Sequence, residues 1–376
     1  MSKTKLLFVI GTRPEAIKLA PVIRALRFHS DYFETRICAT AQHREMLDQV
    51  MNFFDLRADF DLDLMVPGQD LFGLTNRILR GLQSVIPKIK PDWVVVQGDT
   101  TTSFAASLAA FYSKVPVAHV EAGLRTFDKS SPYPEEMNRQ LISRIADLHF
   151  APTENNRENL VKENIDERKI YVTGNTVIDA LLHCRDKADH SHSTGMRHLR
   201  EILDDDKKLI LITGHRRENF GRGFEQICDA LYRLAMRDDI QIIYPVHLNP
   251  NVQQPVFDRL GDVENIHLIE PLDYPSFVWL MDKSHLVLTD SGGIQEEAPS
   301  LGKPVIVMRE ITERTEAVEA GTVLLAGTDT EKIVSETTKL LDDDDLYQAM
   351  SKRVNPYGDG NASDKIVKAF REISIV

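Results

Sequence analysis

The sequence predicts an α/β protein built from two doubly wound domains in tandem, and three observations lead to this prediction. The 376 residues are too many for one hydrophobic core and suit two domains. Short apolar, β-branched runs alternate with longer amphipathic stretches, as in parallel sheets that helices cover on both faces. The series of apolar runs then starts again in the second half, which indicates a second sheet.

Apolar runs that precede polar or glycine-containing turns are the expected strands. In the first half they are residues 6–10, 35–40, 93–97, 115–120 and 149–151, followed by 169–173. In the second half they are residues 208–213, 240–246, 266–269, 286–288 and 305–308. Helical patterns cover residues 101–112 and 134–147, and the charged stretch 186–206 is expected to form helix and surface loop. Pro21 implies that the first helix either kinks there or starts afresh, and the acidic run 342–345 is expected to be a solvated turn.

Composition excludes several classes of partner. The net charge of −12 argues against binding to nucleic acid or to an anionic membrane, because both need a basic face. The first apolar run has only five residues, whereas a signal-peptide core needs about 7–15 and a membrane helix about 20, so we expect a cytoplasmic protein. Cys38, Cys184 and Cys228 are far apart and have mostly apolar neighbours, which indicates buried, reduced thiols.

Residues 288–298 carry the strongest signal for an anion site. A strand is expected to end there, Gly292 and Gly293 permit close backbone approach, and a helix is expected to begin at about Ile294. Free N–H groups at that helix start, beside Ser291, would bind a diphosphate, and Glu297 could reach a ribose diol. A plain strand–helix turn with acidic residues near the helix start is the alternative interpretation.

Cations follow other expected strands. Arg13 and Lys18 belong to a turn and helix start after the first strand, and His215 lies with Arg216 and Arg217 after residues 208–213. Arginine suits phosphate because its guanidinium can donate two parallel hydrogen bonds. Ordinary surface positions or salt-bridged loops are the alternatives, and Arg314 is a further candidate after a later strand.

Carboxylates gather after the strands of the first half. Asp99 and Glu121 each follow a strand, and Glu135 and Glu136 open a helix. Singly, Asp99 could cap a helix and the two glutamates could be ordinary first-turn acids. Together, converging carboxylates would shift one another's pKa and could act as acid and base.

Two histidines and one acidic pair do not indicate a metal site. His43 and His247 lie just beyond strands, without the paired ligand spacing of a metal centre. Asp61 and Asp63 fit a D-x-D pattern, but the alternation along residues 59–65 explains them equally well.

At these motifs the sequence resembles a known family, the non-hydrolysing UDP-N-acetylglucosamine 2-epimerases of bacteria. The matching segments follow one another along nearly the whole chain: GTRPEAIK (11–18), TAQHREMLD (40–48), GDTTT (98–102), HVEAGLRT (119–126), GNTVIDA (174–180), GHRRE (214–218), YPVHLNP (244–250), DSGGIQEEAP (290–299) and NPYGDG (355–360).

The resemblance implies a GT-B fold, with two Rossmann-like domains and an active site in the cleft between them. The first domain would span residues 1–172, the second, UDP-binding domain residues 173–361, and residues 362–376 would pack back onto the first. It also implies a homodimer, no metal and no nicotinamide cofactor. The implied reaction is epimerisation at C2 of UDP-N-acetylglucosamine, which supplies N-acetylmannosamine units for cell-surface polysaccharides. UDP would leave to give a 2-acetamidoglucal and then add back.

Roles carried over from the family fall into three groups. Implied acid and base groups are Asp99, Glu121 and Glu135, with His215 beside the departing diphosphate. Implied substrate ligands are Arg13, Lys18, Phe277, Ser291, Gly292, Gly293, Glu297 and Arg314. A second UDP-N-acetylglucosamine would act as an allosteric activator at Gln42, His43, Glu136, Arg217 and His247.

Two departures from the family pattern concern the nucleotide side of the site. The family usually has proline where this chain has Thr315, and some members have glutamine at Leu272. Three alternatives remain at this stage: a GT-B glycosyltransferase that uses a UDP-sugar, a hydrolysing epimerase and a non-catalytic sugar-nucleotide sensor. A transferase usually needs one base and a sensor needs none, so the three carboxylates favour epimerisation.

Overall fold

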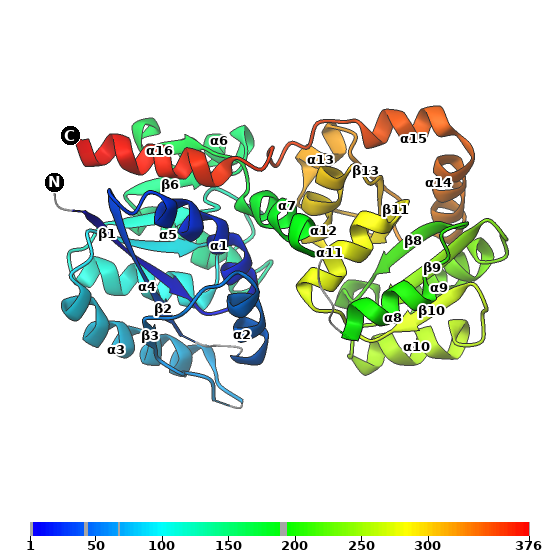
Figure 1. The fold of residues 1–376 in the computed structure, drawn as a ribbon, viewed down its shortest axis with the longest axis horizontal. Helices are drawn as coiled ribbons and strands as arrows, with labels where there is room; N and C mark the ends of the chain where they lie inside the picture. The colour runs from blue at the N-terminus through cyan, green and yellow to red at the C-terminus, as the bar shows by residue number, and fades with distance from the viewer. Residues whose placement is uncertain (1–2, 41–43, 67, 189–193, 376) are drawn as a thin grey trace. The chain divides into compact units, whose positions relative to one another are not determined.

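A computed structural model describes residues 3–40, 44–66, 68–188 and 194–375. The chain forms two compact units, of which the first contains Met1–Ala180 and Tyr357–Val376 and the second contains Leu181–Pro356. The chain thus enters the second unit within helix α7 (Thr176–Ala188), somewhat after the expected boundary at residues 172 and 173. Each unit is a parallel sheet with helices packed on it (Figure 1).

The first unit is built on a seven-stranded sheet in which every strand pair is parallel. In their order across the sheet, the strands are β3 (Phe60–Asp61), β2 (Phe33–Ala39), β1 (Thr4–Ile10), β4 (Trp93–Gln97), β5 (Val117–Val120), β6 (Leu148–Ala151) and β7 (Ile170–Val172). The strand order reverses between β1 and β4, and such a switch point is where doubly wound sheets bind ligands.

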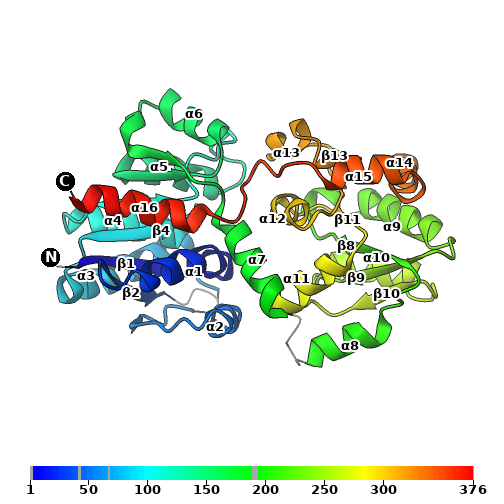
Figure 2. The same cartoon turned by 45° about the horizontal axis from the view of Figure 1, so that its top comes forward.

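Helices cover both faces of this sheet. They are α1 (Arg13–Phe28), α2 (Arg44–Phe53), α3 (Leu71–Ile89), α4 (Thr101–Tyr112), α5 (Glu135–Ile145), α6 (Glu154–Lys162) and the start of α7, with a 3₁₀ turn at Glu167–Lys169. Helix α16 (Ala362–Ile375) lies beside α1 (Figure 2). The buried ring of Phe370 on α16 packs edge-on against Trp93 and Phe150, so α16 completes the core of the first unit.

The second unit has six parallel strands. In their order across the sheet, they are β10 (Ile266–Ile269), β9 (Ile240–Pro245), β8 (Lys208–Thr213), β11 (Leu286–Thr289), β12 (Val305–Val307) and β13 (Val323–Leu325). Its helices are α8 (Thr194–Ile202), α9 (Arg222–Leu234), α10 (Pro250–Leu260), α11 (Tyr274–Lys283), α12 (Gly292–Glu297), α13 (Thr315–Glu319), α14 (Thr330–Asp342) and α15 (Asp344–Ser351). Short 3₁₀ turns occur at Arg217–Asn219 and Ala298–Leu301.

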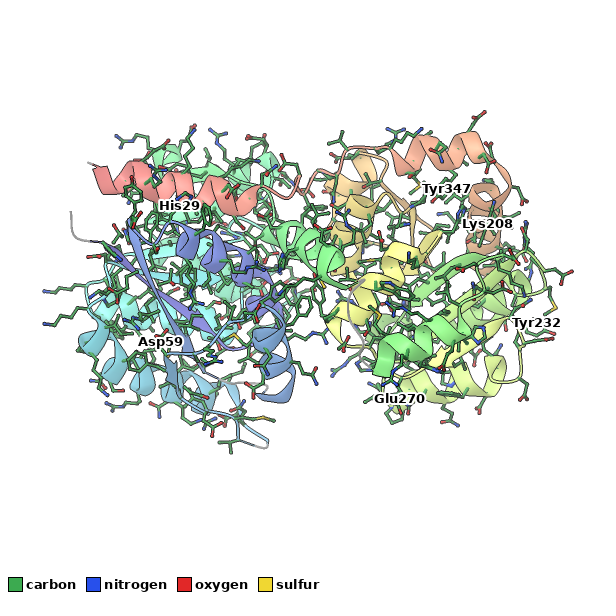
Figure 3. The ribbon with its side chains drawn as sticks, viewed as in Figure 1. His29, Asp59, Lys208, Tyr232, Glu270 and Tyr347 are labelled. Carbon is green, nitrogen blue, oxygen red and sulfur yellow. The ribbon has the colours of Figure 1, made fainter. Side chains whose placement is uncertain are left out.

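Helices α14 and α15 hold the amino ends of the second sheet. Lys208, at the start of β8, donates a hydrogen bond from Nζ to the carbonyl of Leu341 (2.6 Å). Tyr347 of α15 donates to the carbonyl of His285 (3.0 Å) and stacks on the His285 ring with the centroids 4.1 Å apart. Figure 3 labels Lys208 and Tyr347. The turns that contain His215 and Gly292 lie at the opposite, carboxyl ends of β8 and β11.

The expected elements are present, with several differences in detail. Two strands that the sequence pattern did not predict, β3 and β13, are only two and three residues long. Helix α1 continues through Pro21 without starting afresh. Helix α12 begins at Gly292, before the expected start at Ile294. The acidic run is divided, because Asp342 ends α14 and Asp343 caps the start of α15.

The three cysteines are buried free thiols, as the sequence predicted, and burial raises the pKa of Cys38 to about 12. Across the residues that the structure describes, no helix combines the length and the apolar character that a membrane span requires.

Candidate functional site

The turn between β1 and α1 is held by a buried carboxylate. Glu15 is completely buried, and its Oε2 accepts hydrogen bonds from the backbone N–H groups of Gly11 (3.0 Å) and Thr12 (2.7 Å). The Thr12 hydroxyl donates to the same oxygen (2.7 Å), while Oε1 accepts from the hydroxyls of Thr100 (2.8 Å) and Ser103 (2.9 Å). Glu15 therefore joins the turns that follow β1 and β4.

Glu121 stands in a strained turn directly after β5. Its φ of 64° lies in the left-handed region, which costs a non-glycine residue about 1–3 kcal/mol and persists only where the surroundings enforce it. Oε1 accepts from Lys18 Nζ (2.5 Å) and from Asn175 Nδ2 (3.2 Å), and Oε2 accepts from Gln97 Nε2. Three side chains from separate segments thus fix the position of this carboxylate.

Asp99 is engaged by helix α5. Its Oδ2 accepts a hydrogen bond from Arg139 Nε (2.7 Å), and its backbone carbonyl accepts from Asn138 Nδ2 (2.9 Å). The interpretation of Asp99 as the cap of α4 was wrong, because Thr100 occupies that position and accepts from Ser103 N–H. The Asp99 carboxylate does not cap α4 and pairs with Arg139 instead.

His119 supports the same turn from the middle of the sheet. Its Nε2 donates to the carbonyl of Gly98 (2.7 Å), which fixes the tautomer with Nε2 protonated. Burial lowers the pKa of His119 to about 4. A neutral imidazole therefore donates a hydrogen bond that holds the backbone immediately before Asp99.

The two glutamates that open α5 differ in their surroundings. Glu135 is half-buried and has no hydrogen-bond partner among the residues that the structure describes. Glu136 is completely buried and accepts from the backbone N–H groups of Thr126 (3.0 Å) and Phe127 (3.3 Å) and from Arg139 Nη1 (3.0 Å). Burial raises the pKa of Glu136, but the hydrogen bonds, with Gln140 foremost, outweigh it and leave the pKa below its ordinary value.

The structure brings the three predicted acid and base groups to one edge of the first sheet. A Cβ added at Gly98 would lie 3.4 Å from Glu121 Oε2, so the turn that carries Asp99 lies against Glu121. Arg139 joins Asp99 to α5, and Glu135 lies one turn earlier on that helix. Asp99 and Glu121 therefore lie at the neighbouring ends of β4 and β5, as the order of the strands predicted, and Glu135 shares the face of α5 that carries Arg139.

In the second unit, the glycine turn forms the start of helix α12. Ser291 is the residue before α12, and Gly292 is its first residue. A Cβ at Gly292 would lie only 3.0 Å from Cζ of Arg314, so the guanidinium lies against this glycine. Arg314 Nε also donates to Glu296 Oε1 (2.9 Å). A cation and a helix start thus share one surface, as a diphosphate site requires.

Glu297, the last residue of α12, is buried and accepts a hydrogen bond on Oε1 from the Tyr274 hydroxyl (2.9 Å). Phe277 is half-buried three residues after Tyr274 on α11, and residues at this spacing share a helix face. The predicted ribose and uracil ligands therefore belong to neighbouring elements.

His215 has a buried acidic neighbour. Its Nδ1 lies 3.5 Å from Oδ1 of Asp290, a fully buried carboxylate at the end of β11. The His215 ring stacks on His247, with centroids 5.4 Å apart and planes inclined by 16°. Burial lowers the pKa of His215, and Asp290 partly opposes this effect.

The predicted activator residues that the structure describes belong to both units. Gln42 and His43 lie outside the described residues. Glu136 belongs to the first unit, whereas Arg217 and His247 are exposed in the second. His247 stacks on another predicted site residue, His215. No cluster of three or more histidine, cysteine, aspartate or glutamate side chains in the described ranges could hold a metal ion.

Several residues that the sequence did not single out hold the predicted ones in place. They are Glu15, Gln97, His119, Arg139, Asn175, Tyr274, Asp290 and Glu296. Their common signal is position, because most stand in or beside a motif at a strand end. Which atom each one contacts depends on the fold and could not be predicted from the motif.

Two doubly wound units, one with converging carboxylates and the other with a cationic glycine turn, define a GT-B-like α/β protein that fits the nucleotide-binding class. The family model for UDP-N-acetylglucosamine 2-epimerase matches residues 25–371. The chain belongs to this family, which confirms the resemblance inferred from its motifs.

Full-length relatives agree with this assignment. The UDP-N-acetylglucosamine 2-epimerase of Escherichia coli K12 is 58% identical over 370 residues, which cover 98% of each chain. The Salmonella typhimurium enzyme of the same name is 57% identical over 375 residues, or 99% of each chain. The crystal structure of the Neisseria meningitidis UDP-GlcNAc 2-epimerase bound to UDP-GlcNAc has 51% identity and a TM-score of 0.90, and the match covers 98% of this chain and 100% of that one.

Proposed function

We propose that this protein is an isomerase that reversibly epimerises UDP-N-acetylglucosamine at C2 to give UDP-N-acetylmannosamine. The observation that carries the proposal is the convergence of Asp99, Glu121 and Glu135 at one sheet edge, in a chain of this family. A nucleotide-binding module alone would have no use for three carboxylates on separate elements at such an edge.

The proposed reaction proceeds by elimination and re-addition. C2 is not adjacent to a carbonyl, so its proton is only weakly acidic until the C1–O bond to UDP begins to break. Positive charge that develops at C1 then acidifies the C2 proton, which a carboxylate removes to leave a 2-acetamidoglucal. UDP adds back at C1 while a second group delivers a proton to the opposite face of C2. Exclusion of water keeps the glucal from being lost.

The residues of the first unit suit the proton transfers. The Glu121 carboxylate accepts from Lys18, Gln97 and Asn175, so it is held in one orientation. Asp99 is held by Arg139, and Glu135 has no competing hydrogen bond in the described ranges. We assign the acid and base steps to these three carboxylates and contacts with the diphosphate to Arg13 and Lys18, of which Lys18 also holds Glu121.

The residues of the second unit suit the nucleotide. The Ser291 side chain and the backbone N–H groups of Gly292 and Gly293, together with Arg314 and His215, would bind the diphosphate and stabilise its departure. Glu297, oriented by Tyr274, would accept hydrogen bonds from the ribose hydroxyls, and Phe277 would lie along the uracil. We assign the activator role to Gln42, His43, Glu136, Arg217 and His247.

We further propose a homodimer formed through the first unit. Large apolar side chains on and beside α3 and α4 are exposed there, with Phe72 at 88%, Tyr112 at 70% and Phe111 at 62%. Tyr133, Phe72 and Leu79 line one groove along α3, and Leu79, Pro87 and Tyr112 line the next. Exposed apolar surface of this kind is typical of protein interfaces. Sedimentation analysis of a Phe72→Asp variant, expected to be monomeric, tests this proposal.

The cellular role follows from the product. We propose that the enzyme works in the cytoplasm and supplies N-acetylmannosamine units for cell-surface polysaccharides, without metal or nicotinamide.

The decisive experiment follows the substrate in D₂O by proton NMR, with no metal or nicotinamide added. Appearance of UDP-N-acetylmannosamine with deuterium at C2 is the expected result. Release of free N-acetylmannosamine and UDP would indicate the hydrolysing reaction. Binding without any change would contradict epimerisation of this substrate and would direct the search to sugar acceptors or to a sensor role.

A matched pair of variants ties that result to the carboxylates. Asp99→Asn should lose exchange at C2, because the amide cannot take or give the proton. Asp31→Asn alters an exposed acid of the same unit in the loop after α1 and should leave exchange unchanged. Equal exchange by both variants would remove Asp99 from the mechanism.

A further inference from the structure

Asp290 has one carboxylate oxygen that its structural contacts do not explain. The residue is fully buried, and its Oδ2 accepts from the backbone N–H groups of His215 (2.8 Å) and Arg216 (2.8 Å) and from Asn219 Nδ2 (3.4 Å). Its Oδ1 is buried and has no hydrogen-bond partner among the described residues. A buried charged oxygen without a donor costs at least about 1–3 kcal/mol, so a role in holding the loop accounts for Oδ2 only.

The His215 ring carries a potential donor for Oδ1 of Asp290. Its Nδ1 lies 3.5 Å from Oδ1 of Asp290, and stacking on His247 restrains the plane of the ring. A proton on Nδ1 therefore points at the buried oxygen. The opposite nitrogen, Nε2, is turned away from Asp290, and the His215 side chain is 41% exposed.

The charge state of this imidazole depends on the groups around it. Burial lowers the pKa of His215, the neighbouring Arg216 and His247 lower it further, and Asp290 raises it, with the balance below the ordinary value. Without a ligand at neutral pH, the ring is therefore mostly neutral, with its proton on Nδ1 and a lone pair on Nε2. A lone pair repels a phosphate oxygen, whereas a proton on Nε2 would bind it.

We propose that Asp290 is a positioning residue that makes His215 take up a proton at Nε2 when a nucleoside diphosphate binds. The proposal rests on the proposed function for the assignment of the diphosphate to His215. During the reaction the C1–O bond breaks, its electron pair stays on the diphosphate oxygen, and the Nε2 proton passes to that oxygen. On re-addition the proton returns to Nε2 as the C1–O bond forms again.

Replacement of Asp290 by asparagine gives a specific test. The position of Oδ2 must be taken by the amide oxygen, because two backbone N–H groups donate to it. The amide NH₂ then faces His215 Nδ1, which must accept, so the neutral ring carries its proton on Nε2 instead. This tautomer can bind a phosphate oxygen without taking up a proton, but it holds no second proton to give to the leaving group.

The measurement is calorimetric titration of the full chain with UDP near pH 8, in two buffers of different ionisation enthalpy. Free UDP has no proton to lose there, because the second pKa of a phosphate is about 6. Wild type should take up a substantial fraction of one proton per UDP bound, and Asp290→Asn and His215→Gln should each take up almost none. The double variant should match either single one, because both changes remove the same proton.

Two controls separate this effect from general damage. Asp329→Asn changes a helix cap that asparagine fills equally well, so it should retain the proton uptake. His267→Gln removes another histidine of the second unit, on β10, and should also retain the uptake, which ties it to His215. Nitrogen-15 NMR of histidine-labelled protein should show His215 with its proton on Nδ1 in wild type and on Nε2 in Asp290→Asn, without any ligand.

The outcomes distinguish this proposal from the proposed function. UDP binding by wild type without proton uptake, or uptake that persists in Asp290→Asn, would overturn the role of Asp290 and leave the epimerase proposal intact. Failure of wild type to bind UDP would overturn both. Proton uptake by a chain that shows no exchange at C2 would support the roles of Asp290 and His215 and contradict the epimerase proposal.

Discussion

The two units hold polar groups at the same end of similar sheets, but they do so by different means. In the first unit the exposed chemistry belongs to side chains, and other side chains from distant segments hold it, as Lys18, Gln97 and Asn175 hold Glu121. In the second unit the assigned diphosphate ligands include the backbone of the glycine turn, where Gly292 is buried and lies against the Arg314 guanidinium. A diphosphate has a fixed shape and charge, which a backbone turn can match, whereas proton transfer needs titratable side chains in chosen states.

Neutralising the Glu121 carboxylate of the first unit tests this difference between the units most directly. Glu121→Gln should slow C2 exchange by roughly 10²–10⁴-fold, because an amide cannot act as acid or base. UDP binding should persist, since the nucleotide ligands of the second unit are untouched. Deuterium exchange and calorimetry measure the two quantities, with the exposed Glu158→Gln of α6 as the matched control. Equal losses in exchange and UDP affinity would contradict the division of tasks.

The buried support of the first unit should matter mainly for stability. Glu15→Ala removes the acceptor of five hydrogen bonds and leaves buried donors and a cavity. The free energy of unfolding should fall by about 3 kcal/mol or more. Urea titration measures this loss. A change below about 1 kcal/mol would show that water replaces the carboxylate.

The glycine of the second unit should matter mainly for binding. Gly292→Ala places a methyl group 3.0 Å from the Arg314 guanidinium, which must move. UDP affinity should fall about tenfold or more, equivalent to about 1.4 kcal/mol. Gly223→Ala on α9 puts its methyl group in ordinary contact, 3.4 Å from Thr328, and should bind UDP as wild type does. Unchanged affinity in Gly292→Ala would separate Arg314 from the nucleotide.

Buried histidines of the first sheet should lower the free energy of unfolding in mild acid. Burial lowers the pKa of His149 to about 3, and neither ring nitrogen has a hydrogen-bond partner among the described residues. Between the unfolded pKa of about 6.5 and the folded value, the unfolded chain binds more protons, so stability falls as pH falls. His149 alone should cost about 1 kcal/mol between pH 6.5 and 5.5. His149→Leu should reduce the slope in urea titrations over this range, and an unchanged slope would exclude His149 as its source.

The smallest effect concerns the departure from the family pattern in the second unit. Thr315 is the exposed first residue of α13, a position where proline fits because its missing N–H and fixed φ cost nothing there. Thr315→Pro should stabilise the protein by about 0.4–1 kcal/mol, because it restricts the unfolded chain. Thermal unfolding measures this gain. Destabilisation would mean that the backbone at Arg314 cannot accept a following proline.

The sequence predicted the sheets well because their strands are buried on both faces and therefore appear as unbroken apolar runs, as residues 93–97 do. Strands β3 and β13 were missed because two or three residues leave no detectable pattern. Pro21 was ambiguous for a local reason, since the sequence alone cannot show whether packing carries a helix through a proline.

The site was predictable only in part. Strand ends in a parallel sheet meet at one edge, so Asp99 and Glu121 could be brought together from the order of elements alone. Their partners could not, because Arg139 and Asn175 reach them through helix and linker geometry that no local pattern encodes. Asp290 shows the limit most clearly, since the motif locates its carboxylate without telling which oxygen faces His215.

The placement of helix α16 has a consequence for biosynthesis. It follows the whole second unit in the chain, yet Phe370 fills the core of the first unit. As the chain leaves the ribosome, the first 180 residues emerge without the helix that covers Trp93 and Phe150, whereas residues 181–356 emerge as one uninterrupted segment. Domains generally fold as units in the order of synthesis, but here the earlier unit must wait for the later one. A nascent chain stalled before α16 should therefore expose an apolar surface that chaperones recognise.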